Sequence, residues 1–308
     1  MNNKTLATEI ILLGFSNDLR TNICLFPIFL IIYVFSVVGN CLIICVIILN
    51  SPLHTPMYFF LVNLSFIDLC YSSSAIPKLL VDLLSTHRTI SVLGCLIQFK
   101  VLLLVAGSEC QLLAIMAYDR YNAICRPLHY HVLMRWSVCF YLVAFVWIFS
   151  FVSIIMPSFV MPIIVCYPNK VNHFMCEVLS VLKLSCDDTS VQKLVIFSVG
   201  LFAIVLPFLL IIVSYISIIS TVLKIRAARR SRAFSTCTSH ITVVVTYFGT
   251  AMITFLTPPS METLNLDKYV SIFYVIISPM LNPVIYSLNN REVKKALIKT
   301  LLVCLTQI

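Results

Sequence analysis

The stretch CLFPIFLIIYVFSVVGNCLIICVIIL (24–49) decides the fold, because it contains no Asp, Glu, Lys or Arg. A helix needs about 20 mostly apolar residues to cross the hydrocarbon core of a bilayer. Six further stretches of this kind follow along the chain. The predicted spans are 24–49, 57–80, 95–121, 138–161, 194–223, 236–257 and 268–288. We therefore expect the chain to cross a membrane seven times by α-helix.

The composition of the whole chain supports this prediction. Of the 308 residues, 60% are hydrophobic and 11% are charged, whereas a soluble domain has about 25% charged residues. Lipid tolerates only helices or closed barrels, and the short alternating segments of a membrane barrel are absent. No internal repeat or long linker divides the sequence. The fold class is predicted as an all-α membrane protein, with one domain over 1–308 that forms a seven-transmembrane helix bundle.

Lysine and arginine residues predict the direction of crossing, since they collect on the cytoplasmic side of membrane proteins. One side of the predicted bundle has twelve of the 21 basic residues and only Asp119 and Glu292 as acids. The twelve are Arg120, Arg126, Arg135, Lys224, Arg226, Arg229, Arg230, Arg232, Arg291, Lys294, Lys295 and Lys299. Segment 1–23, which lacks the pattern of a cleavable signal peptide, is therefore expected outside the cell, and the tail 289–308 inside it. The net charge of +9 reflects this topology, and no nucleic-acid partner is expected.

Asn3 begins the triplet Asn3-Lys4-Thr5, an acceptor motif for N-linked glycosylation. The predicted topology places it outside the cell, where glycosylation occurs. A second match, Asn63-Leu64-Ser65, falls inside a predicted span. We therefore expect only Asn3 to be modified.

Four strings at the ends of the predicted spans point to a family. They are LHTPMYFFLVNLSFIDLCYSS (53–73), MAYDRYNAICRPLHY (116–130), RAFSTCTSH (232–240) and PMLNPVIYSLNN (279–290). With Gly39-Asn40, and in this order over nearly the whole chain, they closely resemble a vertebrate olfactory (odorant) receptor of the rhodopsin-like (class A) G-protein-coupled receptors. The sequence departs from the family pattern at Tyr247-Phe248-Gly249, where the two aromatic residues are exchanged, and at Asn289, where arginine is common.

The resemblance implies an odorant receptor of the plasma membrane. Such a receptor binds a small-molecule odorant and activates a heterotrimeric G protein of the stimulatory, or olfactory, type, which raises cyclic AMP. It performs no covalent chemistry, so neither enzyme activity nor a cofactor beyond a bound ion is expected. Two alternatives stay open. One is a rhodopsin-like receptor for an internal metabolite outside the nose; the other is an ion channel or transporter, for which inverted repeats would be the sign.

Asp119, Arg120 and Tyr121, at the inner end of the third span, are predicted to form the coupling site. An arginine beside an aspartate at a helix end can close on its neighbour or be released toward a partner. In similar receptors this arginine contacts the C-terminal helix of the G protein. The resemblance makes Tyr215, His240 and Tyr286 neighbours of Arg120 in the active state.

A proline inside the seventh span is predicted to form a switch. Proline removes a helical hydrogen bond and kinks the helix. The group expected to act together is Asn282, Pro283 and Tyr286.

Asp68 and Glu109 have the highest free-energy cost of any residues in the predicted spans, because a charge inside a bilayer is unfavourable unless it is paired or hydrated. At 1.5 Å per residue, both lie about 16–18 Å from the inner ends of their spans. Two carboxylates at the same depth either bind a cation or share a proton. We predict a sodium site, with Asn282 and Asn40 nearby; the alternative is one protonated acid hydrogen-bonded to the other.

Four cysteines fall on the outer, oxidising side: Cys95, Cys166, Cys176 and Cys186. They allow three pairings, and their spacing alone cannot choose. The resemblance favours Cys95–Cys176, together with Cys166–Cys186. The long loop of about 162–193 would then form a lid over an outer cavity.

The ligand pocket is predicted from position in the outer half of the spans. Its expected lining is almost entirely apolar and suits a small, largely uncharged ligand. The residues are Leu102, Leu103, Ala106, Gly107, Cys110, Val199, Ala203, Phe248, Ala251, Met252, Phe255, Ile272 and Val275. Lys100 is expected to extend its charge toward the membrane surface.

The segment 291–304 is predicted to be a short amphipathic C-terminal helix on the inner leaflet. Its apolar residues recur at Val293, Leu297, Leu301 and Cys304. Membrane lipid is thus an expected partner, and Cys304 is a candidate for palmitoylation.

Overall fold

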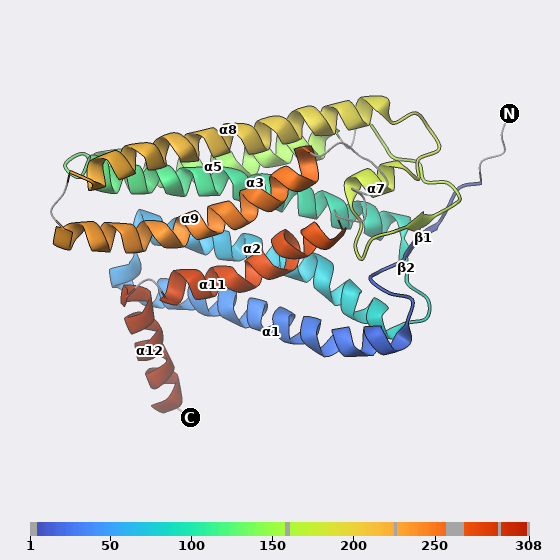
Figure 1. The fold of residues 1–308 in the computed structure, drawn as a ribbon, viewed down its shortest axis with the longest axis horizontal. Helices are drawn as coiled ribbons and strands as arrows, with labels where there is room; N and C mark the ends of the chain where they lie inside the picture. The colour runs from blue at the N-terminus through green and yellow to red at the C-terminus, as the bar shows by residue number, and fades with distance from the viewer. Residues whose placement is uncertain (1–4, 158–160, 225–226, 257–267, 289–290, 307–308) are drawn as a thin grey trace.

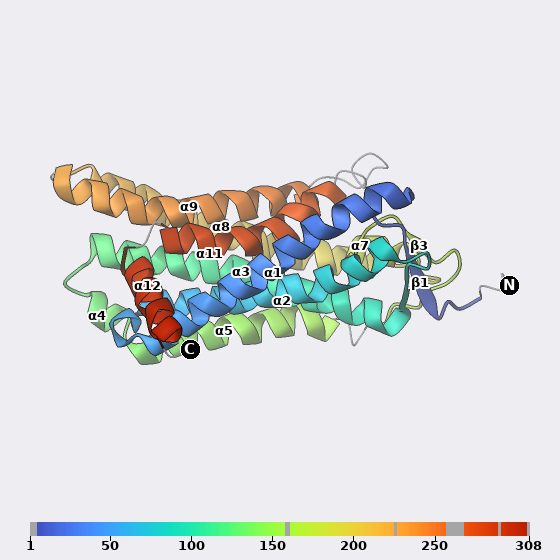
Figure 2. The ribbon, with the colours of Figure 1, turned by 90° about the horizontal axis from the view of Figure 1, so that it is seen from below.

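The computed structural model describes residues 5–157, 161–224, 227–256, 268–288 and 291–306. Its long helices lie side by side along one axis, with the N-terminus at one end and α12 toward the other (Figure 1, Figure 2). The long helices are α1 (Leu19–Leu49), α2 (Pro56–Leu84), α3 (Val92–Cys125), α5 (Trp136–Ser150), α8 (Ser190–Val222), α9 (Ala227–Leu256) and α11 (Ser278–Leu288). The shorter helical elements are η1 (Ser51–Leu53), α4 (Tyr130–Leu133), α7 (Val178–Leu182) and α12 (Arg291–Thr306).

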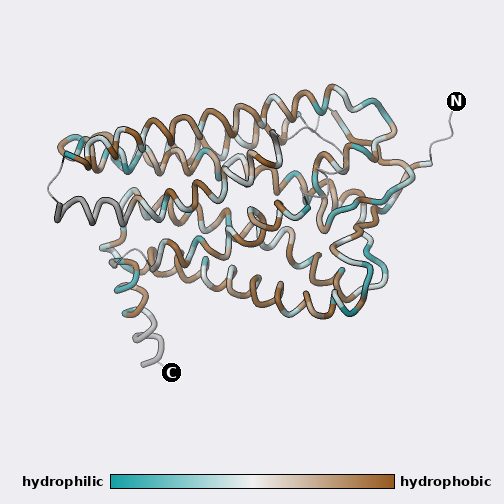
Figure 3. Tube along the Cα trace, viewed as in Figure 1, coloured by the Kyte–Doolittle hydropathy of each residue, from teal (hydrophilic) through white to brown (hydrophobic). Residues whose placement is uncertain are grey.

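Two π-helical turns complete the fourth and seventh spans. The turn η2 (Phe151–Ile155) continues α5, and η3 (Phe273–Ile277) precedes α11. Six helices of the described chain are long and apolar enough to cross a membrane, among them Trp136–Ile155 and Lys268–Tyr286. The seventh long helix, α9, packs against α3, α8 and α11. Apolar residues dominate along the helices (Figure 3), and the predicted seven-helix membrane fold is confirmed.

Burial differs strongly among the helices. Within the membrane-length segments α3 is the most enclosed, whereas the fourth span and α8 are the least. Large apolar side chains therefore point outward on the outer helices; Phe202 on α8, for example, is 70% exposed. A soluble protein would not present apolar surface on this scale. Lipid is its natural solvent.

Polar caps set where two helices begin. The Asp18 carboxylate accepts hydrogen bonds from the backbone N–H groups of Arg20 and Thr21, so α1 begins earlier than the predicted residue 24. The Ser91 hydroxyl accepts from the N–H of Gly94 at the start of α3. Capping satisfies N–H groups that have no partner inside the helix.

A small sheet at the N-terminal end of the molecule was not predicted. The strands β1 (Glu9–Leu12), β2 (Thr89–Ser91) and β3 (Lys170–Val171) lie in the order β2-β1-β3. β1 pairs antiparallel with β2, Ile10 opposite Ile90, and parallel with β3, Ile11 opposite Lys170. The sheet joins the N-terminal segment to the two loops that flank α3 and α7. Strands of two to four residues give too short a pattern to be read in a sequence.

Two disulfides stabilise the same end of the molecule. Cys95 in the first turn of α3 is bonded to Cys176, with a Cα–Cα distance of 5.4 Å. Cys166 is bonded to Cys186, with a Cα–Cα distance of 5.5 Å. These are the pairs that the resemblance favours. They hold the loop between the fourth span and α8 over the ends of the helices.

His173 connects this loop to the seventh span. Its Nδ1 accepts a hydrogen bond from the N–H of Met175 at 3.2 Å, and its Nε2 lies 3.2 Å from Oγ of Ser271. The neighbouring Phe174 ring stacks on Phe15 at 4.8 Å, which adds the N-terminal segment to the same contact. His173 is 2% exposed. We call the sheet and this loop (residues 161–189) the cap.

Lower pH is expected to destabilise the cap through His173. Burial, and then the positive charge of Lys268, lower the pKa of His173 from 6.5 to about 3. Below about pH 6.5 the imidazole of His173 is therefore protonated in the unfolded chain but stays neutral in the folded chain. The contribution of His173 to stability is complete above that pH, and it is lost at up to about 1.4 kcal/mol per pH unit as the pH falls toward 3.

Thermal unfolding of the detergent-solubilised protein between about pH 7.5 and 5 measures this slope. His173→Asn keeps an acceptor for the N–H of Met175 but cannot titrate, so its stability should vary less with pH. An equal slope in both proteins would contradict the assignment.

Candidate functional site

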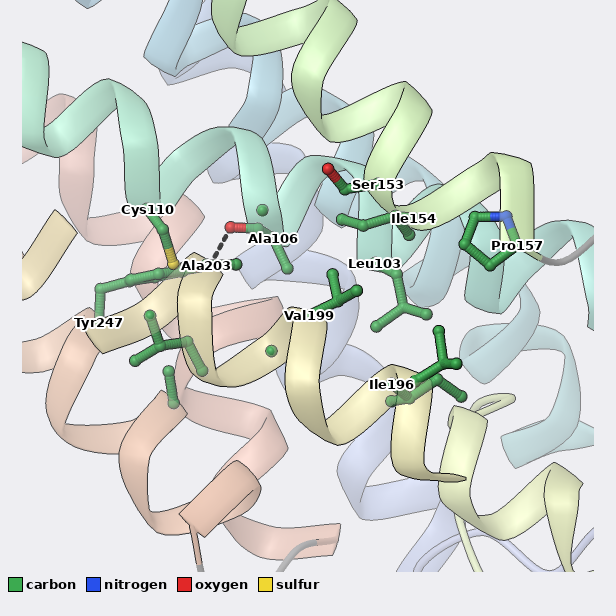
Figure 4. Close-up of a pocket in the computed structure, with 15 residues that line it drawn as sticks. Leu103, Ala106, Cys110, Ser153, Ile154, Pro157, Ile196, Val199, Ala203 and Tyr247 are labelled. Carbon is green, nitrogen blue, oxygen red and sulfur yellow. Dashed lines mark hydrogen bonds between the residues drawn. The ribbon is translucent and has the colours of Figure 1, made fainter. Parts of the chain in front are cut away.

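An apolar cavity of about 80 Å³ lies between α3, the η2 end of the fourth span, α8 and α9 (Figure 4). A water molecule needs about 10–15 Å³ of such space, so the cavity can hold a small organic molecule. Its mainly hydrocarbon lining favours an uncharged one. The lining residues are Leu103, Ala106, Gly107, Cys110, Ser153, Ile154, Pro157, Val195, Ile196, Val199, Gly200, Ala203, Ile204, Tyr247 and Ala251.

Close packing of the third and fourth spans shapes one wall. A Cβ at Gly107 would lie 2.7 Å from Cδ1 of Ile154, so only glycine fits there without a shift. Ile154 belongs to η2, and single π turns inside helices change the direction of the side chains and occur often at functional sites. Ser153 and Ile154 lie beside the cavity together with Leu103 of α3 (Figure 4).

Tyr247 of α9 forms the floor of the cavity and its main polar contact. The phenol donates a hydrogen bond to the carbonyl oxygen of Ala106 at 2.9 Å, drawn as a dashed line in Figure 4. Its oxygen also lies 3.2 Å from the hydroxyl of Tyr71 on α2, and Sγ of Cys110 lies 3.9 Å away. Tyr247 thus joins α9 to α2 and α3 at the bottom of the ligand space.

The order of the aromatic residues Tyr247 and Phe248 explains why a hydroxyl group lies at the cavity. Tyr247 takes the cavity position, while Phe248 packs against Phe208 of α8, with ring centroids 5.4 Å apart. Both aromatic side chains are almost fully buried. A hydroxyl at Phe248 would face an apolar contact, whereas the hydroxyl at Tyr247 has partners.

A second cavity of about 40 Å³ lies directly under the cap. It shares Leu103, Ala106, Tyr247 and Ala251 with the first cavity, so the two cavities adjoin. The cap contributes residues 175–178, and the seventh span contributes Tyr274. The loop with the two disulfides therefore forms part of the wall.

Many of the predicted pocket residues line these cavities, and some do not. The larger cavity includes Leu103, Ala106, Gly107, Cys110, Val199, Ala203 and Ala251, and the smaller one adds Leu102. Neither cavity includes Phe248, Met252, Ile272 or Val275. Phe248 and Val275 are buried in helix packing, and their contact with a ligand stays a prediction. The Phe255 side chain lies outside the described residues.

Sequence reasoning missed the fourth span and Tyr247. Ser153, Ile154 and Pro157 line the larger cavity although no fourth-span residue was predicted. The signals were present in the sequence: a serine and a proline inside an otherwise apolar span, and the exchanged Tyr247-Phe248 pair.

The two buried acids of α2 and α3 have different partners. Nδ2 of Asn282 donates to both carboxylate oxygens of Asp68, at 3.1 and 3.0 Å. Neither carboxylate oxygen of Glu109 has a hydrogen-bond partner within the described residues, although Glu109 is 1% exposed and within electrostatic reach of Asp68. Asn40 donates instead to the carbonyl of Pro279 at 2.9 Å. No group of three or more His, Cys, Asp or Glu side chains suited to a metal occurs in the described part of the chain.

Asp119 and Arg120 do not form an ion pair with each other in the described structure. The hydroxyl of Tyr130, from α4, donates to Oδ1 of Asp119 at 2.9 Å. Tyr121 points elsewhere, with the Arg126 guanidinium 5.5 Å from its ring centroid. Arg120 is 6% exposed, and Asp119 has the Tyr130 hydroxyl group as its hydrogen-bond partner.

Three predicted neighbours do lie around Arg120. The hydroxyl of Tyr215 lies 2.8 Å from Nδ1 of His240, which joins α8 to α9. Tyr215, His240 and Tyr286 are all within electrostatic reach of Arg120. Pro283 packs on α1, where a Cβ at Gly39 would lie 3.2 Å from its ring.

The helix α12 leaves the bundle at a steep angle (Figure 1). Val293 is fully buried, whereas Lys294 and Lys295 are exposed. Nδ2 of Asn50 at the end of α1 donates to Oγ1 of Thr300 at 3.2 Å. The side chains of Leu301 and Cys304, and the whole of Asn3, lie outside the described residues.

The fold and the cavity define a seven-helix membrane protein with an apolar cavity between its helices. A sequence profile of the olfactory receptor family matches residues 29–304. Olfactory receptor 2A5 of Homo sapiens is 44% identical over 302 residues, which are 97% of this chain and of that protein. Olfactory receptor 5AR1 of Mus musculus is 44% identical over 296 residues, or 96% of each. The chain belongs to the olfactory receptor family, whose members are receptors rather than enzymes.

Proposed function

We propose that the chain is an odorant receptor that binds small, largely apolar volatiles in the cavity above Tyr247 and activates a stimulatory heterotrimeric G protein. The resulting second messenger is cyclic AMP. Family membership supports the receptor function, and the cavity supports the ligand class. The observation that carries the proposal is an apolar cavity between the helices that is lined by Tyr247, whose hydroxyl group bonds to two other helices.

The cavity and the proposed coupling site share one helix. Tyr247 and His240 are seven residues apart on α9, two helical turns on the same face. His240 bonds to Tyr215 beside Arg120. If α9 can adopt two positions in the bundle, a ligand that binds one of them more tightly shifts the equilibrium toward it. The shift then affects both Tyr247 and His240.

The proposed orientation places the cap outside the cell and α12 inside, in the plasma membrane. The cap contains both disulfides, which form in an oxidising compartment. The opposite end contains Arg126, Arg135, Lys294 and Lys295, in keeping with the excess of basic residues on cytoplasmic sides.

A cyclic AMP screen of chemically diverse volatiles in cells tests this function. For any volatile that activates the wild type, Ala203→Phe should fill the cavity and weaken the response at least roughly tenfold, since overpacking costs about 1–3 kcal/mol. Leu206→Phe is the matched control, because Leu206 is 56% exposed on the same helix. Arg120→Ala should abolish the cyclic AMP signal at equal surface expression. A response that survives Arg120→Ala unaltered would contradict the coupling mechanism.

We further propose that a sodium ion binds between Asp68 and Glu109. Support comes from the two Glu109 oxygens, which are buried without a partner among the described residues, and from the cost of leaving a polar group unsatisfied in an apolar interior. The alternative, a proton shared by the two acids, predicts no dependence on sodium.

Dose-response curves in sodium and choline buffers separate these possibilities. Sodium should raise the agonist concentration for half-maximal response, because it stabilises the arrangement in which Asn282 bonds to Asp68. Asp68→Asn should remove the difference between the buffers. Equal curves for the wild type would exclude the ion.

A further inference from the structure

The N-terminal segment passes through the middle of the cap. β1 is the central strand of the sheet, with β2 on one side and β3 on the other. Backbone hydrogen bonds continue this pairing beyond the strand. The N–H of Ala7 donates to the carbonyl of Val165 at 3.0 Å, and the N–H of Gly14 donates to the carbonyl of His173 at 3.1 Å. Residues 7–14 therefore attach the loop over the cavities to β2, at the start of α3.

The side chains of β1 alternate between two faces of the strand. Ile10 and Leu12 are 0% and 1% exposed, whereas Ile11 between them is only partly buried. β1 packs against α3, and the two buried residues belong to an apolar cluster that includes Phe99 of α3 and Val178 of α7. One face of the N-terminal strand is therefore part of the packing at this end of the bundle.

The same cluster forms the roof of the cavities. Phe99 and Val178 line the cavity under the cap. Both also line a third cavity, of about 50 Å³, which shares Leu103 with the larger apolar cavity. Ile10 and Leu12 line none of these three cavities. They form a second layer of the roof, in the same cluster as the side chains that do line them.

The second layer limits how far the roof can move. Protein interiors are close-packed, so Phe99 and Val178 have no room to move away from a ligand while Ile10 and Leu12 fill the space behind them. The loop cannot lift away from residues 7–14 either, unless it gives up the backbone hydrogen bonds to them. Buried backbone groups without a partner are costly.

We propose that β1 sets the size limit of the ligand site, with Ile10 and Leu12 as positioning residues that act through Phe99 and Val178. Shortening either side chain of β1 leaves space that the surroundings fill only in part. The roof can then retreat toward β1, and the cavities beneath it accept a longer ligand. This inference rests on the proposed odorant function, and it adds that a strand outside the cavities selects ligands by length.

Straight-chain methyl ketones from pentanone to decanone test this limit in the cyclic AMP assay, with surface expression measured for each variant. Ile10→Ala should make the most potent ketone about one or two carbons longer, since each additional methylene that fits gains roughly fourfold in affinity. Leu12→Ala should act in the same direction. Ile10→Val, the smaller truncation, should give an intermediate result.

Ile11→Ala is the matched control, because it truncates the same kind of side chain on the other face of β1. It should leave the order of potencies in the ketone series unchanged. An order that Ile10→Ala also leaves unchanged, even if every ketone becomes weaker by a common factor, would overturn the proposal. An equal shift in Ile10→Ala and Ile11→Ala would overturn it as well.

Cysteine labelling tests the roof without an odorant. Cys110 lines the larger cavity, whereas Cys139 is buried in α5 and does not line it. In the purified protein, methyl methanethiosulfonate should label Cys110 several-fold faster in Ile10→Ala than in the wild type or Ile11→Ala, with Cys139 unchanged. Equal acceleration at both cysteines would indicate general destabilisation. That result, or an unchanged rate at Cys110, would contradict a roof held by Ile10.

The role of β1 and the receptor function can fail separately. If no volatile raises cyclic AMP in any variant but the labelling of Cys110 depends on Ile10, the receptor function is wrong and the role of β1 stands. If volatiles raise cyclic AMP but neither the ketone order nor the labelling depends on Ile10, the role of β1 is wrong and the receptor function stands.

Discussion

The hydrogen bonds between Asn282 and Asp68 are the constraint on which the helix arrangement depends. Asp68 is fully buried at mid-depth, and the amide of Asn282 contacts both of its carboxylate oxygens. In an apolar bundle no water replaces a lost partner, so these bonds fix the seventh span against α2. Asn40 fixes α1 to the same span through the carbonyl of Pro279. Any change in the conformation of the bundle must either keep these hydrogen bonds or replace them with others.

The apolar cavity lies between α3, the fourth span, α8 and α9. There a single hydroxyl group, that of Tyr247, connects the helices. Tyr247 bonds to the backbone of α3 and to Tyr71 of α2 in surroundings that are otherwise apolar. A ligand that displaces this ring therefore changes how α9 packs on its neighbours. Because His240 lies on the same face of α9 and bonds to Tyr215 beside Arg120, the cavity and the Arg120 end of the bundle have a physical connection.

Much of this arrangement could be predicted from single residues. The long apolar stretches predict where the helices lie in the sequence. The depth of a polar side chain in the bundle follows from its position along its helix, as for Asp68, Asn282 and Arg120. The partner of Asp119 could not be predicted, because Tyr130 reaches it from a separate short helix. The sheet of the cap could not be predicted for a similar reason: β1, β2 and β3 come from distant parts of the chain. The wall at Ile154 depends on a π turn, which has no sequence pattern of its own.

The most direct test is to map where an activating odorant sits. A photoreactive analogue of an agonist found in the cyclic AMP screen, cross-linked to the purified receptor, identifies the contacted peptides by mass spectrometry. We expect labels within 103–110 of α3 and 195–204 of α8, the segments that line the cavity, and their loss in Ala203→Phe. Labels confined to outward-facing residues or to the Arg120 end of the bundle, and unchanged by Ala203→Phe, would contradict a ligand site above Tyr247.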